Sequence, residues 1–123
     1  MADSQELNQG DMMDVRIEQK EGIAVCYIKG EVNINTVSAL KESFKTLLDG
    51  DSKKVVLNMS EVDYIDSLGL ATLIKFYRDL EENGGGLALS NITPKIGSIF
   101  RITKVDKALN LFETEEDALN NLV

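Results

Sequence analysis

A short segment that is apolar on both faces sets the strongest limit on the fold. Lys53–Met59 contains Val55, Val56 and Leu57 in succession. A half-exposed strand would alternate apolar with polar residues, whereas an unbroken apolar run is typical of a central strand covered on both faces. The amphipathic periodicity of neighbouring segments indicates that helices provide this cover. The segment therefore predicts an α/β domain.

The rest of the chain alternates between strand and helix patterns that are bounded by turn signals. We expect a hairpin whose strands begin at Asp14 and Ile23, with its turn at Glu21-Gly22, followed by a loop from Gly30 to Asn35. Next we expect a helix capped by Asn35 or Thr36 and ending near Gly50, and then the 53–59 strand. A helix from about Ser67 to Glu82 should stop at Asn83–Gly86 and be followed by a strand over Leu87–Ser90. The last expected elements are a helix opened by Thr93-Pro94, a strand over Leu109–Phe112 and a helix starting at Thr114–Asp117.

This order predicts one domain with a mixed sheet of about five strands and about four helices packed on it. Residues 1–12 are polar and lack an apolar period, so we expect a flexible N-terminal tail. The domain is expected to occupy residues 13–123. No repeat or linker divides it.

Composition excludes several kinds of chemistry. The chain has no histidine, which rules out a histidine-based triad, metal site or proton shuttle. Its one cysteine, Cys26, lies in an apolar run and is expected to fill the core. A net charge of −8 disfavours partners such as nucleic acid and acidic membrane lipids. No apolar stretch approaches the ~20 residues that span a bilayer, and no secretory signal is present, so a cytoplasmic location without cofactor or metal is expected.

The junction between the central strand and the next helix admits three roles for Ser67. A nucleophile would need a general base, and no motif provides one. A helix N-cap, formed by Asp66 or Ser67, needs no further function, and the residues alone favour it. A phosphoacceptor would place about −1.5 to −2 charge at the positive end of the helix, at the edge where α/β domains carry their sites. The residues leave the cap and the phosphoacceptor open.

A helical wheel divides the helix that begins near Ser67 into two faces. The core face holds Leu70, Leu73, Ile74, Tyr77 and Leu80, and the opposite face holds Leu68, Thr72, Lys75 and Asp79. A leucine therefore stands on the outward face beside a modifiable hydroxyl. We interpret Leu68 as a partner contact.

Several segments, in this order and spacing, resemble the STAS family, and within it the free-standing anti-sigma factor antagonists. The hallmark is an acidic residue, a serine, a variable residue, a glycine and an aliphatic residue after an apolar strand, which stands here as Tyr64-Ile65-Asp66-Ser67-Leu68-Gly69-Leu70. The similarity covers about residues 14–122. It includes the loop Ile28–Asn33, the turn and strand Asn83–Leu89, and the segments Phe100–Thr103 and Leu109–Phe112.

The resemblance implies a binding protein and not an enzyme. Its unphosphorylated form would sequester an anti-sigma factor, a serine kinase of the GHKL type, and so free a sigma factor. The kinase would phosphorylate Ser67, and the antagonist would then dissociate from the kinase. A PP2C-like phosphatase would restore the unphosphorylated antagonist. The residues implied in partner binding are Gly30, Glu31, Asn33, Asp66, Ser67, Leu68, Gly69 and Thr72. Asp66 would position the serine, and Gly69 would let the partner approach the backbone closely.

Two positions depart from the family pattern. Leu68 replaces a small residue, and Asn33 replaces an aspartate. These two departures favour an alternative function. In it, the chain is a STAS partner switch or scaffold that acts on a non-sigma target in a biofilm, secretion or second-messenger pathway. A constitutive scaffold would leave Ser67 as a cap alone. A ligand-binding or enzymatic α/β domain would instead need a concave pocket with converging polar groups.

Overall fold

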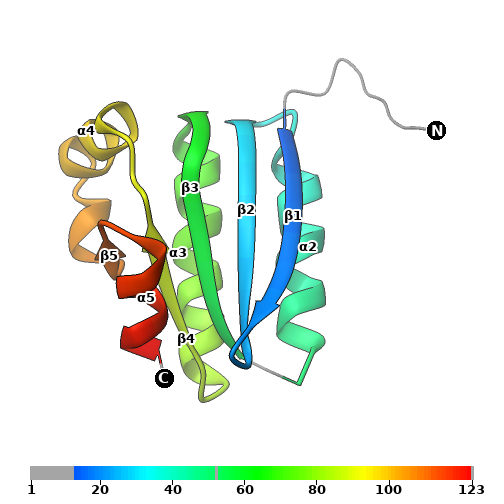
Figure 1. The fold of residues 1–123 in the computed structure, drawn as a ribbon. Coiled ribbons are helices and arrows are strands. Elements are labelled where there is room, and N and C mark those ends of the chain that lie inside the picture. Colours follow the sequence, from blue (N-terminus) through cyan, green and yellow to red (C-terminus); the bar gives the residue numbers. More distant parts are fainter. Residues whose placement is uncertain (1–12, 52, 123) are drawn as a thin grey trace.

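Five strands form one mixed sheet in the order β1-β2-β3-β4-β5 (Figure 1). The computed structural model describes residues 13–51 and 53–122, so the predicted tail, residues 1–12, lies outside the described residues. The elements are β1 (Met13–Lys20), β2 (Ile23–Val32), α2 (Val37–Asp49), β3 (Lys54–Ile65), α3 (Ser67–Glu82), β4 (Gly86–Ser90), α4 (Pro94–Ile102), the 3₁₀ turn η1 (Val105–Lys107), β5 (Leu111–Phe112) and α5 (Glu115–Leu122). The predicted α/β class with five strands and four α-helices is confirmed over this part of the chain.

The sheet topology determines where the helices lie. β1 pairs with β2 antiparallel, and the remaining neighbours pair in parallel. Each crossover after β2 adds its strand at the same edge, and right-handed crossovers then place α2, α3 and α4 on one face. Their side chains join one large core with those of the strands. α5 covers the other face over β3 and β4 (Figure 1).

The apolar run of β3 is covered on both faces, as its sequence predicted. Val55 and Leu57 belong to the core beneath α2 and α3, while Val56 packs with Ala118 of α5. Cys26 of β2 lies in the same helix-side core, and burial raises the pKa of its thiol to about 12. A thiol that stays protonated at neutral pH is a poor nucleophile. The expectation that Cys26 fills the core is confirmed.

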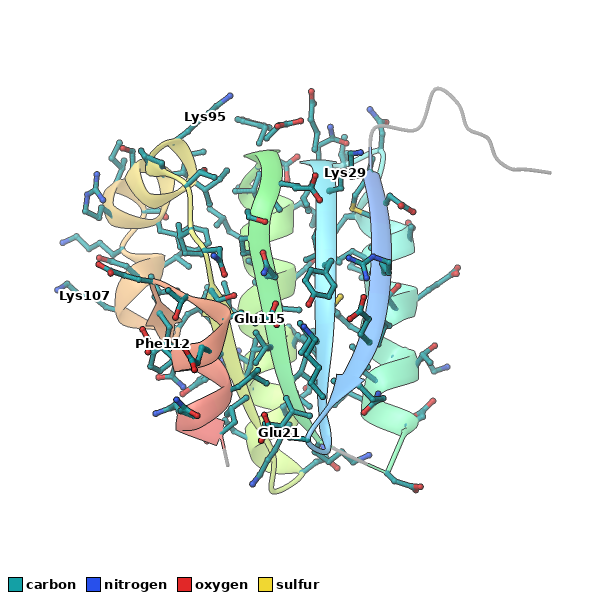
Figure 2. The ribbon with its side chains drawn as sticks, in the orientation of Figure 1. Glu21, Lys29, Lys95, Lys107, Phe112 and Glu115 are labelled. Atoms are coloured by element: carbon teal, nitrogen blue, oxygen red, sulfur yellow. The ribbon has the colours of Figure 1, made fainter. Side chains whose placement is uncertain are left out.

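Glu115 anchors α5 to the sheet. Its carboxylate accepts hydrogen bonds from Lys20 Nζ at 2.7 Å and from Asn58 Nδ2 at 3.1 Å. Glu115 is labelled in Figure 2. Partial burial alone would raise the pKa of Glu115, but the bonds from Lys20 and Asn58 outweigh it, and the pKa lies below its ordinary value. The bond to Glu115 raises the pKa of Lys20. This pair therefore keeps both charges across the neutral pH range.

Three predicted boundaries were wrong. The central strand was expected over Lys53–Met59, but β3 runs from Lys54 to Ile65. The segment Gly30–Asn35 was expected to be a loop, but β2 continues to Val32 and only residues 33–36 connect it to α2. Gly30 has φ +101 at a shift in the β2–β3 register, so it forms a bulge inside the strand. The last strand is also shorter than the expected Leu109–Phe112, since only Leu111 and Phe112 pair with β4. The predicted start and end of α3 are confirmed.

The wheel for α3 was wrong about its second face. Phe76, which the wheel assigned to neither face, is buried, and the predicted core residue Tyr77 is half-buried and packs against the core. The reason is that α3 packs on α2 as well as on the sheet. The rings of Phe44 and Phe76 stack with centroids 3.9 Å apart and an interplanar angle of 6°. Thr72, assigned to the outward face, is 6% exposed.

Candidate functional site

Asp66 connects the carboxyl ends of β2 and β3 to the start of α3. Its backbone N–H donates to Val32 O at 3.0 Å, which continues the strand pairing by one residue. Its Oδ1 accepts from Gly69 N–H at 2.9 Å, so Asp66 is the N-cap of the helix. Its Oδ2 accepts from Ile34 N–H at 3.0 Å. One carboxylate thus fixes both the helix start and the 33–36 loop.

The 33–36 loop is held by its own polar side chains. Thr36 Oγ1 accepts from Asn33 N–H at 2.9 Å and donates to Glu31 O at 2.8 Å. Thr36 occupies the N-cap position of α2, but its side chain makes no bond to the helix, so the predicted capping role was wrong. Asn33 Oδ1 accepts from Asn35 N–H at 2.9 Å. An amide at position 33 therefore supplies the acceptor that shapes the loop, a bond for which an aspartate is not required.

Removal of the Asp66 carboxylate tests its positioning role. We expect Asp66→Ala to lower the free energy of unfolding by about 1 kcal/mol, because the cap of α3 is lost. Asp66→Asn keeps one acceptor oxygen for Gly69 N–H and should recover most of this stability. Urea titration measures the stability, and hydrogen exchange measures the amide of Ile34. Both variants should speed exchange at Ile34, and unchanged exchange in both would contradict the tether.

Ser67 is the first residue of α3 and is exposed. Three exposed apolar side chains accompany it: Ile34 is 72%, Tyr64 41% and Leu68 37% exposed. We call the side chains of Ile34, Tyr64, Ser67 and Leu68 the Ser67 patch. Exposed apolar groups gathered around one polar group are typical of a protein-interaction surface. The predicted outward position of Leu68 agrees with this exposure.

Sequence reasoning missed two members of the patch. Ile34 stands between two asparagines in a polar loop, and that contrast was the available signal. Tyr64 was given no role beyond its place in the family motif, but its side chain is partly exposed, and Lys95 Nζ lies 5.8 Å from its ring centroid. Lys29 and Lys95 lie toward the same end of the sheet (Figure 2).

Gly69 is buried, and its surroundings explain the residue type. A methyl group at this position would lie 2.7 Å from side-chain carbons of both Val32 and Ile65. Real side chains do not approach this closely, so the helix start is packed directly on the strand ends. The close approach that Gly69 permits is therefore within the domain, and its predicted contact with a partner stays a prediction.

The remaining predicted residues lie around the patch at different depths. Glu31 and Asn33 are half-buried beside the loop, and Gly30 is half-buried in the bulge. Thr72 Oγ1 donates to Leu68 O at 2.8 Å and offers a partner little surface. Within residues 13–51 and 53–122, no group of three or more acidic or cysteine side chains is arranged to hold a metal ion. No helix in these ranges is long and apolar enough to cross a membrane.

The family model for the STAS domain matches residues 14–118. The chain belongs to the STAS domain family. The match spans every strand of the sheet and the whole of the Ser67 patch, so the resemblance seen in the sequence is confirmed. The site described above is therefore the segment that follows the central strand of a STAS domain.

Individual relatives agree with this assignment. The chain is 26% identical to an anti-sigma-B factor antagonist of Staphylococcus aureus over 89 residues, which are 72% of this chain and 82% of the relative. The crystal structure of an anti-sigma factor antagonist from Mycobacterium paratuberculosis matches with a TM-score of 0.83 and 25% identity, over 94% of this chain and 98% of that one. The phosphorylated form of the Bacillus cell-fate determinant SpoIIAA shares the fold, with a TM-score of 0.67 and 20% identity over 89% and 100% of the two chains.

Proposed function

We propose that this STAS protein is a phosphorylation-controlled binding switch. In the unphosphorylated form, the Ser67 patch docks on an anti-sigma factor of the GHKL serine-kinase type, and a sigma factor is freed. Phosphorylation of Ser67 dissociates the complex, and a PP2C-like phosphatase removes the phosphate so that the chain can bind again. The relatives named as anti-sigma factor antagonists support this role, and the phosphorylated SpoIIAA structure supports the use of a phosphate on this fold.

One observation carries the proposal: an exposed serine hydroxyl begins a 16-residue helix, with exposed apolar side chains next to it in the chain and on the loop tethered to Asp66. The apolar groups favour a docked, largely dry interface. The helix start tolerates a phosphate because backbone N–H groups and the helix dipole face it. The same phosphate is unfavourable once a partner excludes water, since burying an unpaired charge costs several kcal/mol. Modification therefore leaves the fold intact and removes the partner.

The proposal assigns no catalytic step to this chain. Asp66 is the carboxylate nearest to Ser67 in sequence, and both of its oxygens accept hydrogen bonds from backbone N–H groups. It is therefore a positioning residue and not a free general base. The kinase supplies the phosphoryl-transfer chemistry, and this chain supplies an accessible hydroxyl in a fixed place.

Mass spectrometry tests the modified residue. The full chain is incubated with ATP and the GHKL-type anti-sigma kinase of the same organism, and phosphate is then mapped. We expect one phosphate on Ser67 and none in Ser67→Ala. Modification at another residue, with Ser67 untouched, would contradict the assignment.

A further inference from the structure

A second concave site lies at the carboxyl ends of β4 and β5, apart from the Ser67 patch. It is a cavity of about 370 Å³ between α4, η1 and the residues around β5. Its walls include Ile92, Gly97 and Arg101 on one side and Asp106 and Phe112 on the other. Phe112 marks the β5 side in Figure 2. This edge of a parallel sheet is where α/β domains usually bind small molecules.

Asp106, which lines this cavity, has a buried acceptor atom, Oδ1, that lacks a donor among the described residues. Asn91 Oδ1, in the residue before Ile92, is in the same condition, and Asn91 has a left-handed backbone with φ +59. Buried polar atoms are normally paired, and a carboxylate accepts hydrogen bonds only. The Asp106 carboxylate on the cavity wall therefore favours a ligand that carries N–H donors.

Gly97 gives an independent indication. It lies inside α4, where glycine is a poor helix former. A methyl group there would meet Arg101 Nη1 at 3.5 Å and Ile92 Cγ2 at 3.7 Å, which are ordinary contacts. The fold thus leaves room for alanine at this position. A glycine that packing does not require, on the wall of a cavity, is accounted for by the close approach of a ligand to the helix backbone.

The charges decide which ligands fit. Asp106 and Glu113 line the cavity with one cation, Arg101, whose guanidinium donates to Ser98 Oγ at 3.1 Å. The two carboxylates outnumber the one cation, so the cavity favours a positive ligand. We propose that this cavity binds a small organic ammonium compound, whose N–H groups donate to Asp106 and whose apolar body packs over Gly97 and Phe112.

Phenethylamine is a suitable probe because it carries an ammonium group on an aromatic body. It is titrated into the ¹⁵N-labelled full chain, and amide shifts are followed. We expect saturable shifts confined to about residues 91–113, with the amides of Asp66–Gly69 unmoved. Asp106→Asn should weaken binding at least ~10-fold, and Gly97→Leu should abolish it by filling the cavity. The matched carboxylate 3-phenylpropionate should not bind, and Asp63→Asn is the control for an exposed carboxylate elsewhere.

Three results would overturn the proposal. They are the absence of saturable shifts, equal binding by Asp106→Asn and the unchanged protein, and equal binding of the carboxylate probe. Asp106→Asn is nearly isosteric at a half-buried position and is expected to fold normally, which the dispersion of its amide spectrum checks. Because the readout lies away from Ser67, the outcome is independent of the switch proposed above.

Discussion

Ser67→Asp will bind the anti-sigma kinase roughly 30-fold or more weakly than Ser67→Ala, a difference of about 2 kcal/mol or more. The aspartate places a fixed negative charge in the Ser67 patch, at the residue after Asp66. In the free protein this charge faces water and the helix start, where it is tolerated. Under a docked partner it loses its water, and the complex is weakened accordingly. Isothermal titration of the purified pair measures both affinities.

The matched control for this prediction is Ser60→Asp. Ser60 is an exposed serine of β3, so the change in net charge is the same while the Ser67 patch stays intact. Its affinity should equal that of the unchanged protein. Ser67→Ala should bind at least as tightly as the unchanged protein and stay bound in the presence of ATP. Equal affinities for Ser67→Ala, Ser67→Asp and the unchanged protein would contradict the mechanism.

Gly69→Ala will destabilise the domain by about 1–3 kcal/mol. The added methyl group would overlap side-chain carbons of Val32 and Ile65 at 2.7 Å, so the start of α3 must move away from the strand ends. That movement also strains the bond between Gly69 N–H and Asp66. Urea unfolding monitored by circular dichroism measures the loss, and faster hydrogen exchange at Ile34 would report the displaced loop.

Gly97→Ala is the matched control because it makes the same change inside another helix. Its methyl group meets only ordinary contacts at 3.5 and 3.7 Å, and alanine is the better helix former. We expect a gain of about 0.5–1 kcal/mol. The two substitutions should therefore have opposite signs. A Gly69→Ala variant as stable as the unchanged protein would show that the helix start is not packed on the strands as described.

Local sequence signals predicted the elements well where pattern and capping agree. The α3 helix has Asp66 as its cap, a clear apolar period and a glycine-rich stop, and its predicted bounds are confirmed. The strand β2 was predicted too short because Gly30 was taken as a loop residue. A glycine bulge continues a strand and yet gives the same sequence signal as a turn. Only the pairing with β3 distinguishes the two.

Contacts between elements caused the other differences. The wheel for α3 assumed that one face packs on the sheet, and it could not include the neighbour α2. Burial of Thr72 and Phe76 follows from that second contact, which joins segments far apart in the chain. Asp66 was predicted to position Ser67, but its bond to Ile34 N–H depends on the pairing of β2 with β3. The full membership of the Ser67 patch could therefore be defined only from the structure, although Ser67 and Leu68 were predicted from the sequence.

The place where the partner sits is the most direct test of the switch. Hydrogen exchange of the full chain, alone and in complex with the anti-sigma kinase, maps the covered amides. The account predicts protection of residues 31–36 and 64–70, which is lost when Ser67 is phosphorylated. Protection confined to α5 or to the β4–β5 end, with these residues unchanged, would contradict it.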